Sequence, residues 1–293
     1  MQNPPLRAQS PPPPPPPPLP PSASSCMSLS NIDKGFVPNT EVNSIHSHNL
    51  LRFQENIPSN NSGQILAFNK PVNYVLQSGR TCGVVALSMA SQLIKNVDPD
   101  TIYMSALIRG FSKGGELFSA YNVAVLAEDL LNCDAEVLSD LHSQKSVLLN
   151  HLCDGWPVLI PYDADKNHFP CLNNGLSAHW AVITGLCFPV AEDLDLTSVP
   201  GIKTKVGANI KLCHVKEGQF LKPYLDFSTN MHVYAHQGKS RYMSVWNLDR
   251  LLDSNLNMYE VGKKFLPDEL VLPENDALSE LRNKAVLLKK KAS

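Results

Sequence analysis

The sequence predicts an α+β domain in which an N-terminal layer of helices packs on an antiparallel sheet. Apolar residues with helical spacing come first, between residues 82 and 155, and short β-rich segments separated by glycine, proline and asparagine follow them. Residues 1–62 precede both and are rich in proline, serine and asparagine. We therefore expect a disordered proline-rich segment at 1–62, a folded domain at 63–270 and a C-terminal tail at 271–293.

The helical part begins soon after the first sustained apolar stretch, which starts near Gln64. From Cys82, VVALSMASQLIK places apolar and small residues on one helical face. Asp98 or Asp100 can cap a short helix through TIYMSALIRG, which Gly110 closes. The segments NVAVLAEDLLN and SQKSVLLNHLCDG predict two more helices.

The later segments predict strands, because they are short, rich in β-branched and aromatic residues, and bounded by turn residues. In chain order they are WPVLIPY, AHWAVITGLCF, ANIKLCHV, MHVYAHQ and SRYMSVWNL. The tail ends in ALSELRNKAVLLKKKAS, for which we expect a peripheral helix followed by a basic, solvated end.

The composition of the 293 residues is that of a globular protein: 43% are hydrophobic and the formal net charge is −2. The sequence has no basic stripe, so we expect no nucleic-acid partner. No apolar run approaches the roughly 20 residues that span a bilayer, so we expect no membrane partner. The first residues lack the apolar core of a secretory signal, and we expect a cytoplasmic protein.

The cysteines and histidines do not form a metal-binding pattern. The seven cysteines are irregularly spaced and include no C-x-x-C pair, so we expect free thiols. His232 and His236 form one H-x-x-x-H pair, but they lie in a predicted strand, where four residues span about 13 Å at roughly 3.4 Å per residue. That separation is too large for one ion, and we expect neither a metal nor a cofactor.

A polyproline run stands near the N-terminus. Its fixed φ angles, and the absence of N–H donors other than that of Leu19, favour an extended polyproline II rod. Such a rod can be a stiff spacer, or a ligand for the aromatic-lined grooves of SH3, WW, EVH1 or profilin domains. The prolines of the run are Pro11, Pro12, Pro13, Pro14, Pro15, Pro16, Pro17, Pro18, Pro20 and Pro21.

Three residues are candidates for nucleophilic catalysis: Gln77, Cys82 and His179. Cys82 stands at a predicted helix N-terminus, which favours a thiolate, with Gly79 and Gly83 permitting a tight turn and the close approach of a substrate backbone. His179 opens a predicted strand in SAHWAVITG and can act as a base. Gln77 can fold back so that its amide and the Cys82 N–H form an oxyanion hole.

Cys82 and His179 could each have a structural role instead of a catalytic one. A lone cysteine at a helix start is usually packed in the core, and a lone histidine on a strand is usually structural. It is the combination, with Cys82 on an early helix and His179 on a later strand, that is typical of papain-type catalysis. A third group should orient the imidazole, and the candidates are Gln237, Asn247 and His236.

Several longer motifs resemble one known family. They are QSGRTCGVVALSMASQL, GGELFSA, WPVLIPYDADKNHFPC, AHWAVITG and HQGKSRYMSVW followed by DSN, and together they cover roughly residues 70 to 262. These motifs resemble the actin maturation proteases of animals, a family of papain-like cysteine peptidases that is related to bacteriocin-processing peptidases. The proline-rich N-terminus is similar to that family as well.

The resemblance implies a papain-like peptidase domain that removes the N-acetylated first residue, methionine or cysteine, from immature actin. By motif, Cys82 is the nucleophile, His179 the base and Gln77 the oxyanion donor. The polyproline run, in this family linked to profilin, would deliver profilin-bound actin. HQGK stands where bacteriocin-type relatives commonly have D-P, which leaves the third catalytic residue open.

Actin, the substrate that the resemblance implies, has an acidic N-terminus. We therefore expect cationic side chains in the part of the cleft that binds the residues after the scissile bond. Candidates in or near the motif loops are Arg80, Lys113, Lys239 and Arg241. A competing hypothesis is a catalytically inactive proline-rich scaffold that binds profilin or SH3-type domains. A further alternative keeps the Cys/His pair but uses it for acyl transfer or isopeptide cleavage.

Overall fold

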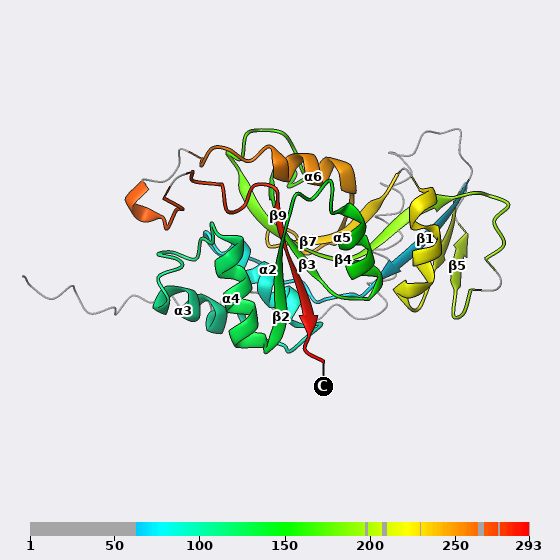
Figure 1. Cartoon of the computed structure of the whole chain (residues 1–293), viewed down its shortest axis with the longest axis horizontal. Coiled ribbons are helices and arrows are strands. Elements are labelled where there is room, and N and C mark those ends of the chain that lie inside the picture. The colour runs from blue at the N-terminus through cyan, green and yellow to red at the C-terminus, as the bar shows by residue number, and fades with distance from the viewer. Residues whose placement is uncertain are drawn as a thin grey trace, which may run out of the picture.

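A computed structural model describes residues 63–292 apart from 197–198, 207–209, 229, 263–266 and 275. The described chain is an α+β domain built on one large sheet (Figure 1). The strands are β1 (Gly63–Asn69), β2 (Cys133–Ser139), β3 (Val158–Asp163), β4 (Ala178–Val190), β5 (Lys203–Val206), β6 (Ile210–His214), β7 (His232–Gln237), β8 (Ser244–Asn247) and β9 (Lys284–Lys290). The helices are α2 (Cys82–Ser91), α3 (Pro99–Ile108), α4 (Ala120–Leu131), α5 (Lys145–Cys153) and α6 (Leu248–Leu256), with 3₁₀ segments η2 (Gly218–Phe227) and η3 (Pro267–Glu269).

The strands form a sheet in the order β2-β9-β3-β4-β1-β6-β5, with β7 on the other edge of β4 and β8 on β7. The long strand β4 holds this arrangement together. Its first half pairs with β3 and its second half with β1. The expectation of a purely antiparallel sheet is wrong at one place, because β1 and β6 run parallel.

Helices cover both faces of the sheet, whereas the sequence predicted one helical layer. On one face α2, α3 and α4 pack against Leu159, Trp180 and Val182. On the other face α5, α6 and η2 pack against Ile160 and Ile183. Because neighbouring strand residues point to opposite faces, central strands that are apolar throughout can be buried on both sides.

The local helix signals are confirmed. Helix α2 begins at Cys82, as its pattern predicts. Helix α3 is capped by Asp98, whose side chain accepts a hydrogen bond from the N–H of Thr101, and Asp100 lies in its first turn. The helices expected after residue 120 are α4 and α5. We find these elements where expected because capping residues and helical periodicity are local signals.

The C-terminal segment does not form the expected peripheral helix. Residues Lys284–Lys290 form β9, which lies between the edge strand β2 and β3 and pairs with both (Figure 1). Ala285, Val286, Leu287 and Leu288 are buried. A short apolar run fits a helix or a doubly buried strand equally well, and here pairing with neighbouring strands decides the outcome. Strand β2 was likewise not predicted.

Candidate active site

Cys82 is the first residue of α2 and lies half-buried at a cavity. The preceding turn uses Gly79, whose φ of +63° lies in the left-handed region. At the N-cap, the Thr81 hydroxyl donates to the carbonyl of Ser78 at 2.8 Å instead of accepting from the helix. The first N–H groups of α2 therefore remain available at the cavity, where they can stabilise negative charge on sulfur or on a substrate oxygen.

Gly83 brings the start of α2 close to β4. A Cβ atom at this position would lie 3.0 Å from Cδ1 of Leu117 and 3.0 Å from Cδ1 of Trp180. The Trp180 indole in turn donates to the carbonyl of Leu117 at 2.8 Å. The glycine at position 83 thus permits the close approach of side chains of the protein itself. It places Cys82 against the strand residue that follows His179.

His179 is the second residue of β4 and lines the same cavity as Cys82. Its Nδ1 lies 3.0 Å from the carbonyl oxygen of Ser177. A carbonyl oxygen only accepts, so Nδ1 carries the proton and Nε2 has the free lone pair. Nε2 is buried and has no hydrogen-bond partner among the described residues. The ring thus presents a base nitrogen in the tautomer that a thiol can protonate.

A buried carboxylate holds the loop that carries Ser177. Asp163, at the end of β3, is fully buried. Its Oδ2 accepts from the N–H groups of Asn173 (2.8 Å) and Gly175 (2.9 Å), and its Oδ1 accepts from that of Ser177 (3.0 Å). One side chain thereby fixes the backbone of the residue whose carbonyl orients His179.

The cavity around Cys82 and His179 has a volume of about 300 Å³. Gln77, Arg80, Glu116 and Lys239 are among its polar lining residues, and most of the others are apolar. The lining residues are Gln77, Gly79, Arg80, Cys82, Glu116, Leu117, Phe118, Leu176, Ser177, Ala178, His179, Trp180, Lys239, Val261, Gly262, Leu270 and Leu281.

Burial keeps both reactive groups neutral in the resting protein. It raises the pKa of the Cys82 thiol above its usual value, against the opposing effect of the N–H groups of Trp180, Gly83 and Cys82 and the charge of Lys239. It also lowers the pKa of His179, although the Ser177 carbonyl favours the protonated ring. The cavity is therefore lined by a neutral thiol and a neutral imidazole.

Gln77 also lines the cavity. Its backbone N–H donates to the carbonyl of Gly238 at 2.7 Å, and its side-chain Nε2 donates to the carbonyl of Gly79 at 2.8 Å. A primary amide has two N–H groups, so one remains for a ligand. The side chain also has a buried Oε1 without a partner among the described residues.

The structure gives the imidazole an orienting group that the sequence did not suggest. Ser177 contacts His179 Nδ1 through its backbone carbonyl. Gln237 instead accepts from the N–H of Lys239 at 2.6 Å, and Asn247 caps α6 by accepting from Arg250 at 3.0 Å. His236 is buried in β7. None of these three candidates is among the described residues that line the cavity.

The four candidate cations divide into two pairs. Arg80 and Lys239 line the cavity. Lys113 stands beside it, with its Nζ donating to the carbonyl of Asp268 at 2.7 Å. Arg241 packs over the ring of Tyr74, 5.7 Å from its centroid. Only the first pair is therefore placed to meet a ligand within the cavity.

Other predictions concern metals, membranes and the proline-rich run. Within the described residues no group of three or more His, Cys, Asp or Glu side chains could hold a metal ion. No described helix is long and apolar enough to cross a membrane. The polyproline run, from Pro11 to Pro21, and the whole segment 1–62 lie outside the described residues.

The apolar walls of the cavity could not be predicted from the sequence. Val261, Gly262, Leu270 and Leu281 come from a region that gave no chemical signal. Glu116, Leu117 and Phe118 lie within the motif GGELFSA, but nothing in that motif indicated which wall they form.

Comparison with known proteins assigns the family. Residues 72–187, which include Gln77, Cys82 and His179, match the family described as "Actin maturation protease-like, C-terminal domain". A curated Danio rerio protein named "Actin maturation protease" is 32% identical over 244 residues, which cover 77% of this chain and 75% of that protein. The chain belongs to the actin maturation protease family.

Further relatives of the same name agree with this assignment. The Xenopus tropicalis actin maturation protease is 35% identical over 73% of this chain and 70% of its own length. The Homo sapiens actin maturation protease is 31% identical over 73% of this chain and 63% of its own length. No solved structure matches the chain significantly.

Proposed function

We propose that this protein is a papain-like cysteine peptidase that removes the N-acetylated first residue, methionine or cysteine, from immature actin. The observation that carries the proposal is that Cys82, at a helix N-terminus, and His179, whose Nε2 has no hydrogen-bond partner among the described residues, line one cavity. Relatives named actin maturation protease support the substrate. A role in actin maturation and a proteolytic activity both follow from that kinship.

The reaction begins with the neutral pair. The Cys82 thiol gives its proton to His179 Nε2 as the sulfur attacks the carbonyl carbon of the first residue. The negative charge moves to the carbonyl oxygen, where the N–H of Cys82 and the amide of Gln77 can stabilise it. The Nδ1–H bond to Ser177 favours this direction of transfer, because it stabilises the imidazolium that forms.

The tetrahedral intermediate then collapses. The C–N bond breaks, and His179 returns its proton to the departing amine, which becomes the new N-terminus of actin. A thioester joins Cys82 to the acetylated first residue. Water attacks this thioester with His179 as base, and release of the acetylated amino acid restores the thiol.

The lining of the cavity suits this substrate. An acetylated N-terminus carries no positive charge, so an apolar pocket can bind it without a carboxylate. Arg80 and Lys239 line the cavity, where they can contact the acidic residues that follow the scissile bond. Lys113 and Arg241 can extend this positive field outside the cavity.

We further propose that the polyproline run from Pro11 to Pro21 recruits profilin-bound actin in the cytoplasm. A preformed polyproline II helix loses little entropy on binding an aromatic groove, which suits a recruitment role. If recruitment were the whole function, the protein would be a scaffold with an inactive domain, and Cys82 would then be dispensable.

Mass spectrometry of actin N-termini tests the proposal. Cells lacking the protein would be rescued with wild type, Cys82→Ala or Cys171→Ala. Cys171 is a matched control, because it is also a half-buried free thiol but does not line the cavity. We expect wild type and Cys171→Ala to restore mature actin and Cys82→Ala to leave the first residue in place. Equal rescue by Cys82→Ala would favour the scaffold.

A further inference from the structure

The apolar lining of the cavity includes a residue far along the chain from Cys82 and His179. Leu270 is only 4% exposed and lines the cavity directly after the short helix η3. The apolar side chains of the lining are Leu117, Phe118, Leu176, Ala178, Trp180, Val261, Leu270 and Leu281.

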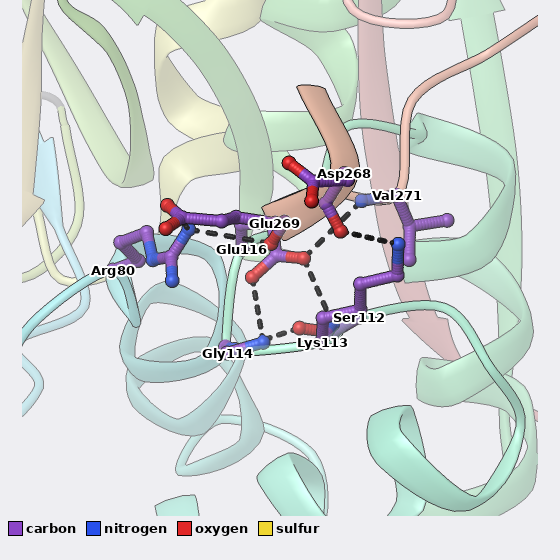
Figure 2. A network of polar contacts seen from close by, with 9 residues as sticks. Arg80, Ser112, Lys113, Gly114, Glu116, Asp268, Glu269 and Val271 are labelled. Atoms are coloured by element: carbon purple, nitrogen blue, oxygen red, sulfur yellow. Dashed lines mark hydrogen bonds and ion pairs between the residues drawn. The ribbon is translucent and has the colours of Figure 1, made fainter. Parts of the chain in front are cut away.

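The residues before Leu270 are held by two cations. Lys113 Nζ donates to the carbonyl of Asp268 at 2.7 Å (Figure 2). Arg80 Nη1 donates to the carbonyl of Glu269 at 3.3 Å and lies 3.8 Å from its carboxylate. Both contacts use backbone carbonyls, so they fix the position of the chain itself.

The residue after Leu270 is held by a buried carboxylate. Glu116 is only 4% exposed, and its Oε1 accepts from the N–H of Val271 at 3.3 Å. The same carboxylate accepts from the N–H groups of Lys113 and Gly114, each at 2.8 Å (Figure 2). Glu116 thereby joins the loop that leads into the Leu117 wall to the segment that carries the Leu270 wall.

We infer that Leu270 determines which first residue the enzyme accepts, and that Glu116 is the positioning residue that holds Leu270 in place. The inference rests on the proposed function, and it assigns the apolar lining of the cavity to the side chain of the acetylated first residue. Leu117 and Leu270 both line this cavity of about 300 Å³. On this inference the Leu270 side chain leaves room for an unbranched side chain such as methionine and excludes an aromatic ring.

The segment that carries Leu270 is not an adaptable flap in this arrangement. Contacts on both sides of Leu270 tie it to the loop at residues 112–116 and to the turn before Cys82. Gly115 contributes as well, because a Cβ atom there would lie 2.6 Å from the Thr81 methyl group. The wall is therefore positioned by the same loop that packs against the start of α2.

Kinetics on a pair of peptides tests this inference. The full-length protein would be given acetylated peptides of the acidic actin type that begin with either methionine or phenylalanine. We expect Leu270→Ala to raise the ratio of kcat/KM for phenylalanine over methionine by about tenfold or more, since a methylene-sized change in an apolar pocket has effects of this order. Leu270→Val, a milder truncation, should shift the ratio in the same direction.

Two further variants test the positioning role of Glu116 and the specificity of the Leu270 effect. Glu116→Gln keeps the size of the side chain but leaves a single accepting oxygen for three N–H groups, so the ratio should move as in Leu270→Ala, by a smaller factor. Leu138→Ala is the matched control, because Leu138 is a comparably buried leucine (6% exposed) that does not line the cavity. It should leave the ratio unchanged.

The kinetic results can show separately whether the role of Leu270 and the proposed peptidase function are correct. A wild-type protein that cleaves the methionine peptide, with an unchanged ratio in Leu270→Ala and Leu270→Val, would overturn the inference alone. A wild-type protein that cleaves neither peptide would overturn the proposed function, and the inference with it. A shift in both Leu270 variants but not in Leu138→Ala supports both.

Discussion

Replacing Asp163 by asparagine should reduce catalysis without any change to a residue that touches substrate. The carboxylate accepts three backbone N–H groups, two at Oδ2 and one at Oδ1. An asparagine has a single accepting oxygen, which gains most by facing the two donors of Asn173 and Gly175. Its NH₂ group then faces the N–H of Ser177, donor against donor. The backbone that orients His179 is therefore the part that moves.

The size of the effect follows from the bonds lost. A hydrogen bond to a buried charged group contributes about 1.5–3 kcal/mol, and an unsatisfied buried donor has a similar cost. Losing the Ser177 bond in this way should lower the free energy of unfolding by about 2–4 kcal/mol. A misplaced imidazole should also lower kcat by roughly a hundredfold, the usual loss when a catalytic group is displaced by about 1 Å.

The assay combines urea unfolding with kinetics on an acetylated actin-type peptide. Asp165→Asn is the control, because Asp165 belongs to the same loop and also accepts backbone N–H groups, from Asn167 and Phe169, but does not contact Ser177. It should leave kcat nearly unchanged. If Asp163→Asn unfolded more easily yet kept the wild-type kcat and pH profile, the link from Asp163 through Ser177 to His179 would be refuted.

Three further predictions concern pH and packing. Because burial lowers the pKa of His179, the acid limb of the pH profile of kcat/KM should lie below about 6.5, and a limb above that value would contradict a neutral resting base. Burial likewise lowers the pKa of His232 to about 4, so the unfolded chain binds more protons between pH 4 and about 6.5, and stability should fall by about 3 kcal/mol as the pH drops through that window. Chemical denaturation at several pH values should show a shallower fall for His232→Asn, and an equal slope would rule the histidine out. Gly83→Ala adds a Cβ atom 3.0 Å from both Leu117 and Trp180, so it should destabilise the protein by about 1–3 kcal/mol and lower activity, whereas unchanged thermal unfolding and kinetics would show that the helix start can shift.

The features that the sequence predicted are those with local causes. Helix α2 begins at Cys82 because the glycine turn and the helical pattern meet there, and Asp98 caps α3 through an N–H three residues away. Placing Cys82 and His179 in one cavity followed from two motifs whose order is typical of a known architecture. These inferences needed only neighbouring residues or a resemblance.

The features that were missed depend on contacts between distant segments. Asp163 ends a strand like many other aspartates, and only the folded loop shows that its acceptors meet Ser177. The apolar run of β9 could have been helical, and only its pairing with β2 and β3 makes it an interior strand of the sheet. Leu270 carries no chemical signal, because an apolar wall depends on shape alone.

The rate at which the purified protein cleaves an acetylated actin N-terminal peptide tests the central claim, that Cys82 is the nucleophile. Wild type, Cys82→Ala and Cys171→Ala would be compared after their unfolding free energies are shown to be similar. The account predicts that Cys171→Ala cleaves at nearly the wild-type rate and that Cys82→Ala loses activity by about a thousandfold or more, as expected when a nucleophile is removed. Cleavage by Cys82→Ala at the wild-type rate would contradict it.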